Sequence, residues 1–488
     1  MEGSAKTGSL WLYDDTMKLT FWGAARQVTG SMYLLELEDN YRILIDCGTN
    51  MERNLEEEEE NKPLFPFDAS SLNLVLLTHA HIDHSGNIPN LYRDGYEGQV
   101  LCTTPTYELS RLLLMDAAHL NQKKLQRATG DSNKKKKRMA RLEKKGDLYL
   151  DKQVDDSLEN FVTIAFNQKF QVTDNLWLTF IPAGHLLGAA HIILETKEKG
   201  EKKSICFSGD LGRKNYPLHV EPSPVPQVDY LVCESTYGSR LHEDNRSPEE
   251  ALADVIRRTC INIPGRLIIP AFSVGRTQAL LFTLNRLYSE QGFKPIRVFS
   301  DSPLAHSTTK VYDRHSKFLN PESQDFKQKH GRLFDFQNLT FIESEKASRA
   351  ISNHNEPCII ISASGMVSGG RVEQHVAANI GNPYCTILLV GYAAEDTLGW
   401  RLLNGQNTLR IKDNEYAVQA KIEKIDVFSG HGDQQDLVNF VKQQSPQKLK
   451  KIFLIHGEET SMQTFANRLN DEGFDDVRIP MKGESFEL

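Results

Sequence analysis

The stretch LTHAHIDHSGN, residues 77–87, places three histidines and an aspartate within six positions, directly after an apolar run. His79 and His81 lie two residues apart, so their side chains point to the same side of an extended chain. Asp83 and His84 follow after a turn. A single histidine is more often an ordinary polar residue, but imidazoles and a carboxylate at this spacing are typical ligands of zinc, or of iron or manganese. The stretch therefore predicts a metal site at the end of a strand.

The length of 488 residues predicts two or more structural units with a large core. A hydrophobic fraction of 39% and a charged fraction of 25% are typical of globular proteins. No apolar run approaches the roughly 18 residues of a membrane helix, and the first residues lack the apolar core of a signal peptide. We therefore expect a cytoplasmic protein with no membrane partner. The seven scattered cysteines predict reduced thiols rather than disulfides or a thiolate zinc site.

The charge pattern limits how a polyanion could bind. A net charge of −8 gives no global attraction to nucleic acid, so the positive charge for such a partner must be local. The run EEEEE at 56–60 predicts a solvated acidic loop. The lysine run at 134–138, within a basic segment at 134–145, predicts a solvated helix face, with RNA-backbone contact or a nuclear-targeting role as alternatives.

The order of apolar patterns predicts an α/β protein in three segments. Residues 1–240 contain mainly short strand patterns, with one long helical pattern from about residue 106. Residues 241–420 alternate strands and helices, which is typical of a mainly parallel sheet flanked by helices. Residues 421–488 return to the style of the first segment.

Four candidate ligands in one loop cannot complete two metal shells, so we expect further ligands at other strand ends. His185 in FIPAGHLLG, Asp210 in CFSGDLG and His456 in IFLIHGEE each follow an apolar run and stand next to a glycine. Each alone could equally be an ordinary polar residue, and their shared placement favours a common site. His191, inside AAHIILE, is predicted to pack in the sheet instead.

The motif HAHIDH resembles the HxHxDH motif of the metallo-β-lactamase superfamily. Asp46 in ILIDCG, His185 and Asp210 fall in the order of that superfamily's other motifs. Glu234 in CESTYG, His431 in FSGHGD and His456 further resemble motifs A, B and C of its β-CASP group, as in cleavage-and-polyadenylation-endonuclease-like ribonucleases. The resemblance implies a metallo-β-lactamase αββα sandwich, built by residues 1–240 and 421–488, with an inserted β-CASP α/β domain at 241–420.

The same resemblance implies two Zn²⁺ ions, with Mn²⁺ or iron as alternatives. The ligand set that it implies for the first metal is His79, His81 and His185, and that for the second metal is Asp83, His84 and His456. Asp210 would bridge the two metals. Asp46 would accept a hydrogen bond from a liganding imidazole and would not touch a metal.

Catalysis by such a site also needs a proton donor and donors for the phosphates. The resemblance implies that Asp83 takes part in catalysis and that His431 is the general acid, oriented by Glu234. We expect phosphates to be held at a strand-to-helix turn and at a glycine-rich loop, and the alternative is that both stretches are simply tight turns and capped helices. The candidate phosphate-binding residues are Ser273, Gly275 and Arg276 in the first stretch and Ser364, Gly365 and Arg371 in the second.

In the β-CASP group a histidine at motif C accompanies RNA hydrolases, so His456 favours RNA. We therefore expect a zinc-dependent ribonuclease that cleaves single-stranded RNA with a hydroxide activated by two metals. Its action is expected to be mainly endonucleolytic, with 5′ exonuclease activity as a second mode and a homodimer as one assembly. The alternatives are a small-molecule metallo-hydrolase of the thioesterase or lactonase type and a non-catalytic RNA-binding scaffold.

Three departures from the family pattern qualify this expectation. The chain carries neither an N-terminal KH-like extension nor a long C-terminal region, so we expect no added specificity modules. The stretch SASGMVSGGR at 362–371 differs from the pattern of ribonuclease J, which argues against processive 5′ exonuclease action.

Overall fold

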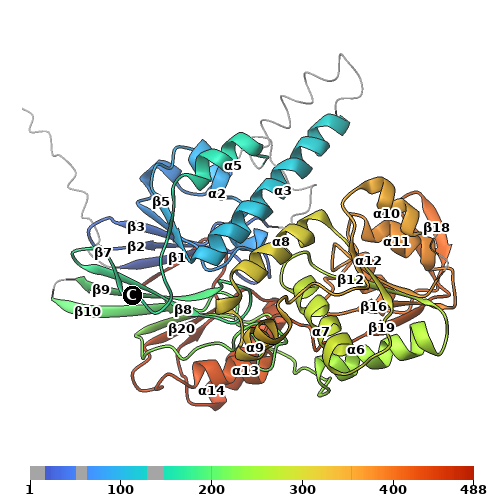
Figure 1. Ribbon diagram of the computed structural model, residues 1–488. Helices are drawn as coiled ribbons and strands as arrows, with labels where there is room; N and C mark the ends of the chain where they lie inside the picture. Colours follow the sequence, from blue (N-terminus) through green and yellow to red (C-terminus); the bar gives the residue numbers. More distant parts are fainter. Residues whose placement is uncertain (1–16, 51–62, 129–147, 199, 353, 355) are drawn as a thin grey trace, which may run out of the picture.

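The computed structural model describes residues 17–50, 63–128, 148–198, 200–352, 354 and 356–488 (Figure 1). The predicted acidic loop at 56–60 and the basic segment at 134–145 lie outside these residues. Within the described part of the chain, no helix combines the length and the apolar character that a membrane crossing requires.

The first unit is a sandwich of two seven-stranded sheets. Strand order in the first sheet is β22-β1-β2-β3-β4-β5-β6, and in the second it is β21-β20-β11-β10-β9-β8-β7. The strands of the first sheet are β1 (Lys18–Gly23), β2 (Met32–Glu36), β3 (Arg42–Ile45), β4 (Leu74–Leu76), β5 (Gln99–Cys102), β6 (Phe161–Thr163) and β22 (Glu484–Glu487). Those of the second sheet are β7 (Phe170–Thr173), β8 (Leu176–Pro182), β9 (Ala190–Glu198), β10 (Glu201–Phe207), β11 (Tyr230–Glu234), β20 (Lys451–Ile455) and β21 (Val477–Arg478).

Alternation along the strands explains the layers of this sandwich. In β2, Tyr33 and Leu35 pack between the two sheets, whereas Met32 and Leu34 pack on the outer face. Because successive side chains of a strand point to opposite faces, both faces of this strand are apolar and both must be covered. Figure 1 shows helices above and below the two sheets. The helices of this unit are α1 (Ile82–Ser85), α2 (Ile88–Arg93), α3 (Thr104–Ala128), α5 (Asp151–Leu158), α13 (Gln434–Val441) and α14 (Glu459–Asp471).

The second unit is built on a six-stranded sheet of order β14-β13-β15-β12-β16-β19. All its strand pairs are parallel, which confirms the predicted mainly parallel α/β domain. Its strands are β12 (Arg266–Pro270), β13 (Arg297–Asp301), β14 (Leu339–Phe341), β15 (Cys358–Ser362), β16 (Cys385–Leu389) and β19 (Lys421–Lys424), with a separate hairpin of β17 (Thr408–Ile411) and β18 (Asn414–Ala417). Its helices are α6 (Pro248–Ile256), α7 (Arg276–Glu290), α8 (Pro303–Arg314), α9 (Pro321–His330), α10 (Glu345–Ile351), α11 (Val372–Asn379) and α12 (Leu398–Leu403). The predicted segment boundary at 420 falls just before β19, which still belongs to this sheet.

The end of the chain returns to the sandwich and completes both of its sheets. Strand β20 pairs in parallel with β11, in a register that sets Ile455 opposite Glu234. Strand β22 then pairs antiparallel with β1 in the other sheet. This pairing brings His456, the residue after β20, beside the end of β11 although 222 positions separate His456 from Glu234.

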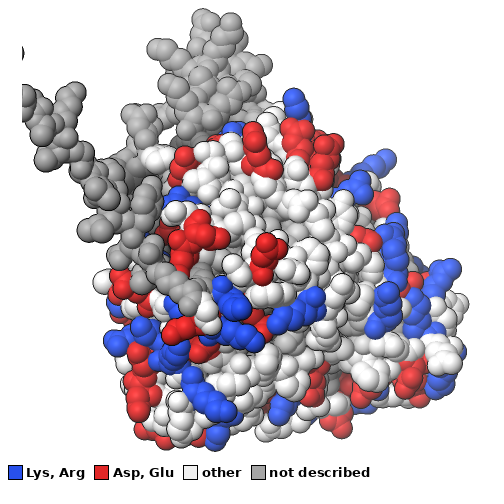
Figure 2. Space-filling model, turned by 90° about the vertical axis from the view of Figure 1, so that its left-hand side faces the viewer, with Lys and Arg blue, Asp and Glu red and all other residues white. Residues whose placement is uncertain are grey.

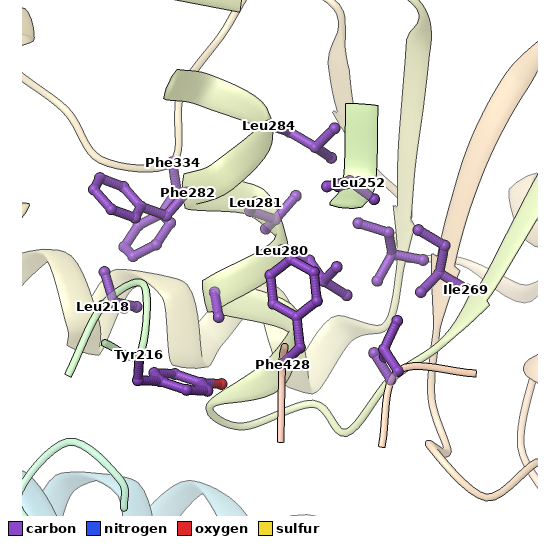
Figure 3. Packing of buried hydrophobic residues seen from close by; sticks show 14 of the residues in the cluster. Tyr216, Leu218, Leu252, Ile269, Leu280, Leu281, Phe282, Leu284, Phe334 and Phe428 are labelled. Atoms are coloured by element: carbon purple, nitrogen blue, oxygen red, sulfur yellow. The ribbon is translucent and has the colours of Figure 1, made fainter. Parts of the chain in front are cut away.

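The two units share one hydrophobic cluster at their junction (Figure 3). Phe282 and Leu281 of α7 lie in it together with Tyr216 and Leu218 from the first segment and Phe428 from the returning chain. A cluster with members from all three segments fixes the position of the inserted unit against the sandwich.

Replacing Phe282 by alanine should therefore destabilise the junction, because the ring is fully buried and its loss leaves a cavity. We expect the free energy of unfolding to fall by about 3–5 kcal/mol, measured by chemical denaturation. The matched control is Leu120→Ala on α3, whose side chain is 50% exposed and whose loss should change stability by less than about 0.5 kcal/mol. Equal effects of the two substitutions would contradict this packing.

Candidate metal centre and its surroundings

Residues that follow strands of both sheets converge at one place beside the returning chain. Asp46, His79 and His81 follow β3 and β4 of the first sheet, whereas His185, Asp210 and His456 follow β8, β10 and β20 of the second. The loop that carries Asp83 packs tightly on Gly48, where an added Cβ would lie 1.7 Å from the Asp83 carbonyl oxygen. Only glycine fits at that position, so the segment after β3 is shaped to seat this loop.

One group of four side chains combines three histidines and a carboxylate. His79 Nε2 and His185 Nε2 lie 3.1 and 3.2 Å from His81 Nδ1. The same two Nε2 atoms lie 3.6 and 3.5 Å from Asp210 Oδ2. His79, His185 and Asp210 are almost completely buried.

A second group lies on the other side of the Asp210 carboxylate. The Asp210 Oδ1 atom lies 3.3 Å from His84 Nε2 and 3.6 Å from His456 Nε2. Asp83 Oδ2 lies 3.4 Å from His456 Nε2 and 3.9 Å from His84 Nε2. The two oxygens of Asp210 thus face two separate sets of ligand atoms.

Both groups fit a divalent cation of the zinc type. Ligands at about 2.0–2.1 Å around a tetrahedral zinc ion lie roughly 3.3 Å from one another, close to the distances within each group. Asp210 Oδ1 is buried and accepts no hydrogen bond from any described residue. A buried carboxylate oxygen without a donor is costly, and a cation would satisfy it.

The ring nitrogens that face away from the two groups have partners of their own. Asp46 Oδ2 lies 2.7 Å from His84 Nδ1, while its other oxygen accepts the Thr78 amide at 2.8 Å. His185 Nδ1 lies 3.1 Å from the Gly430 carbonyl oxygen. Such contacts orient liganding imidazoles and select their tautomers.

Thr236 is a contact that sequence reasoning missed. Its hydroxyl lies 2.9 Å from His456 Nδ1 and 3.1 Å from the His456 carbonyl oxygen. The one hint in the sequence is that Thr236 stands two residues after Glu234 in CESTYG. Its contact with His456 arises only because β11 pairs with β20. His191, predicted to pack in the sheet, is buried in β9 with its Nδ1 2.6 Å from the Ser208 carbonyl oxygen, as expected.

The electrostatics differ between the two groups. Burial lowers the pKa of His79 and His185 well below the usual range of histidine, and that of His81 to about 4. Neutral imidazoles with free lone pairs are what metal ligation requires. Burial also acts to lower the pKa of His84, but the Asp210 carboxylate and its neighbours outweigh burial and raise that pKa well above the usual range. The carboxylate-rich group therefore attracts positive charge.

Glu234 and His431 meet at the rim of this centre. His431 Nδ1 lies 3.1 Å from Glu234 Oε1, and His431 Nε2 lies 4.0 Å from Asp210 Oδ2. Glu234 is fully buried and also accepts the backbone N–H groups of Leu211, at 2.6 Å, and Thr236, at 3.2 Å. The carboxylate is therefore fixed, and the imidazole, 18% exposed, points its other nitrogen toward the cluster.

The first candidate phosphate-binding stretch lies at the start of α7, next to the loop of His185. Gly275 has a φ of 81° and lies against Leu186, 3.0 Å from where its Cβ would be. Arg276 stacks its guanidinium over the Phe272 ring at 4.9 Å and donates from Nε to the Phe428 carbonyl. No acidic side chain among the described residues pairs with this guanidinium, and burial lowers its pKa. Ser273 lies close by, with its hydroxyl 3.0 Å from that of Ser302.

The second stretch meets the first at Phe272. Gly365 packs against this ring, 3.0 Å from where its Cβ would be, and the Ser364 hydroxyl closes the loop by donating to the Ser368 carbonyl at 3.0 Å. The guanidinium of Arg371, predicted to bind a phosphate, is bonded within the protein instead. It donates to Asp301 at 2.7 Å and to the carbonyls of residues 342 and 343, so its donors hold the loop rather than an incoming phosphate.

The charge on one face of the molecule does not single out an RNA path. On the face shown in Figure 2, Lys and Arg side chains are interspersed with Asp and Glu. Within the described residues, Arg276 is a cation near the metal centre with no acidic partner.

Replacing Thr236 by valine, which is nearly isosteric, should weaken metal binding because His456 loses its orienting partner. We expect the affinity of the second group for zinc to fall by about 10- to 100-fold, measured by competition with a chromogenic chelator. Thr464→Val on α14, which removes an exposed hydroxyl, is the matched control and should leave the affinity unchanged. An unchanged affinity in Thr236→Val would show that this hydroxyl does not tune the site.

Models of three protein families match the chain. The metallo-β-lactamase superfamily domain matches residues 34–205, the β-CASP domain matches 277–402, and the zinc-dependent metallo-hydrolase RNA specificity domain matches 415–480. The three matches follow the order of the sandwich, the inserted unit and the returning segment.

Similar proteins cover almost the whole chain. A ribonuclease from Thermus thermophilus is 29% identical over 96% of this chain and 99% of its own length. The transcription termination factor FttA from Methanocaldococcus jannaschii is 29% identical over 99% of this chain and 72% of its own length. A crystal structure of a protein of unknown function from Enterococcus faecalis V583 shares the fold, with a TM-score of 0.54 at 13% identity, over 97% of this chain and all of that one. The chain therefore belongs to the β-CASP group of the metallo-β-lactamase superfamily and carries the metallo-hydrolase domains of that group.

Proposed function

We propose that this chain is a zinc-dependent ribonuclease that hydrolyses phosphodiester bonds of single-stranded RNA, mainly at internal positions. The observation that carries the proposal is the position of His431. Its Nε2 lies 4.0 Å from the shared Asp210 carboxylate, and its Nδ1 lies 3.1 Å from Glu234. A hydrolase that only activates water has no need of a second, oriented imidazole at this place, whereas cleavage of an ester with a poor leaving group needs a proton donor.

The two groups around Asp210 would each hold one Zn²⁺. When bound, a pair of divalent cations supplies a nucleophile from water near neutral pH and offsets negative charge on the phosphate. His79, His81 and His185 would hold the first ion, and Asp83, His84 and His456 the second. Mn²⁺ and iron accept the same donors, so the metal content of the purified protein decides among them.

Residues of the chain would provide the remaining steps. His431 would hold a proton on Nε2 and deliver it to the departing ribose oxygen. Glu234, fixed by two backbone N–H groups, would accept a hydrogen bond from Nδ1 and so keep the ring oriented.

Arg276 is the proposed donor to a phosphate next to the scissile bond. It stands at the N-terminus of α7, where the helix dipole also favours an anion. Its guanidinium stacks on Phe272 and donates from Nε to the Phe428 carbonyl, and its two terminal nitrogens would make the contact to the phosphate. Ser273, Gly275, Ser364 and Gly365 would complete this wall, and Arg371 would hold the loop through Asp301.

RNA is favoured as the substrate for two reasons. Motif C carries a histidine, His456, and the matched domain at 415–480 is named for RNA specificity. The similar protein from Thermus thermophilus is named a ribonuclease, whereas the similar archaeal protein is named a transcription termination factor. We retain 5′ exonuclease action as a second mode, and the homodimer, the cytoplasmic location and the three-segment division remain predictions.

Cleavage of a 5′-labelled single-stranded RNA and of its DNA counterpart tests the proposal. Zinc-loaded wild type should cut the RNA internally and leave the DNA intact. Asp83→Ala should be inactive because it removes a ligand atom of the second group, and His431→Ala should be slower by about 10²- to 10⁴-fold because the leaving oxygen loses its proton donor. Products are resolved on a denaturing gel.

Two results would overturn the ribonuclease. The first is that neither polymer is cut by protein that contains zinc while thioester or lactone substrates are hydrolysed, which would indicate a small-molecule hydrolase. The second is a zinc content near zero in protein made with zinc available, which would indicate a binding scaffold.

The phosphate donor has its own test. Arg276→Ala should raise the KM for RNA by roughly 10-fold or more, since a hydrogen bond to a charged group contributes about 1.5–3 kcal/mol. Arg276→Lys should restore only part of the affinity, because lysine lacks the planar fork. Arg332→Ala, which removes an arginine whose side chain is 72% exposed, is the control and should leave KM unchanged. If Arg276→Ala and Arg332→Ala gave the same KM, Arg276 would not contact RNA.

A further inference from the structure

The chain crosses between the two units twice, and the two crossings meet beside the metal centre. The outgoing segment follows β11, and the returning segment lies between β19 and α13. Gln434 donates from its backbone N–H to the Arg240 carbonyl at 3.0 Å, and from its side chain to the Gly238 carbonyl at 2.6 Å. The two crossings are therefore joined directly, and the returning one carries His431.

His242, on the outgoing crossing, reaches the backbone of His431. Its Nε2 lies 3.0 Å from the His431 carbonyl oxygen, and its side chain is only 7% exposed. A carbonyl oxygen only accepts hydrogen bonds, so Nε2 carries a proton. The ring lies 5.2 Å from that of Tyr237, which in turn lies 6.2 Å from the ring of His431.

Asp426 faces the other ring nitrogen of His242. Its Oδ2 lies 3.7 Å from His242 Nδ1 and also accepts the backbone N–H of Glu243 at 2.8 Å. Its Oδ1 accepts the backbone N–H of Asp244 at 3.2 Å, and its carbonyl accepts Arg213 at 2.8 Å. Asp426 is thus held at several atoms, and it faces a nitrogen of His242.

The loop that His242 contacts is also held on either side of His431. His431 lies between Gly430 and Gly432, and glycine backbones are the least restricted conformationally. The Gly430 carbonyl faces His185 Nδ1 at 3.1 Å, and the Gly432 amide donates to the Leu211 carbonyl at 2.9 Å. The contact from His242 secures the peptide between these two.

We infer that His242 is a positioning residue for the proton donor of the proposed reaction: through the His431 carbonyl and with Asp426 behind it, it sets where the His431 imidazole stands. This inference rests on the proposed function, because it assumes that His431 donates a proton. His242 would touch neither substrate nor metal. Its loss should therefore slow the step that needs the proton and leave metal binding and other steps nearly unchanged.

The test compares two substrates that differ in their leaving group. In RNA the leaving group is a ribose oxygen, which needs a proton as it departs. Bis(p-nitrophenyl) phosphate instead releases p-nitrophenolate, which is stabilised and needs no proton. His242→Ala should lower kcat for RNA by about 10- to 100-fold with little change in KM, as expected from a small displacement of a catalytic group. On bis(p-nitrophenyl) phosphate the same variant should keep more than half of the wild-type rate.

Three further variants make the comparison decisive. His431→Ala should show the same dependence on the leaving group with a larger loss on RNA. His242→Gln, which keeps an N–H donor near the position of Nε2, should recover part of the RNA activity. His119→Ala removes a histidine on α3 whose side chain is 58% exposed and should behave as wild type on both substrates. Zinc content and thermal unfolding are measured for every variant.

The outcomes separate the inference from the proposed function. Suppose that His431→Ala loses much more activity on RNA than on bis(p-nitrophenyl) phosphate. If His242→Ala then loses activity equally on both substrates, or loses none on either, the inference about His242 is wrong and His431 remains the proton donor. The same holds when His242→Gln, folded and containing zinc, loses both activities equally. If His431→Ala loses both activities equally, the proton donor itself is wrong, and the role of His242 is overturned with it.

Discussion

The buried carboxylate of Asp210 is the constraint on which the arrangement depends. It is 2% exposed and lies within 4.0 Å of ring nitrogens from five histidines, which are His79, His84, His185, His431 and His456. A charge so deep in a protein is stable only with opposite charge or strong hydrogen bonds close to both oxygens. Two cations would satisfy it, and the surrounding imidazoles are arranged around each oxygen as separate groups. Much of the fold serves to bring these side chains together.

The topology follows from that requirement. The ligand candidates come from the ends of strands in both sheets, and one of them, His456, comes from a strand near the end of the chain. Between β11 and β20 the chain leaves the sandwich, forms the inserted unit and returns. The return path carries His431 to the rim of the centre, and the shared hydrophobic cluster around Phe282 holds the inserted unit, with Arg276 at the start of α7, against the sandwich. The proposed metal binding, proton donation and phosphate contact would thereby be linked to one junction between the units.

The sequence predicted which side chains meet at this place better than it predicted the contacts that support them. Strand ends and the HxHxDH spacing were readable because a strand pattern and its polar ending are local, and the structure does bring the named residues together. Thr236 and His242 were not readable, because a hydroxyl or an imidazole acquires its partner only when distant strands pair or two crossings meet. Arg371 shows the opposite error: a glycine-rich loop with an arginine suggests an anion site, but the structure places Asp301 beside it. The boundary of the inserted unit also depends on strand pairing, since β19 follows the predicted limit of 420.

The most direct test of the central claim is a crystal structure of the zinc-loaded protein, with anomalous scattering measured on both sides of the zinc absorption edge. The account predicts two zinc peaks roughly 3.5 to 4 Å apart, one on each side of the Asp210 carboxylate. One peak should be held by His79, His81 and His185, and the other by Asp83, His84 and His456. A single peak, or peaks that do not contact Asp210, would contradict the two-metal centre and the reaction built on it.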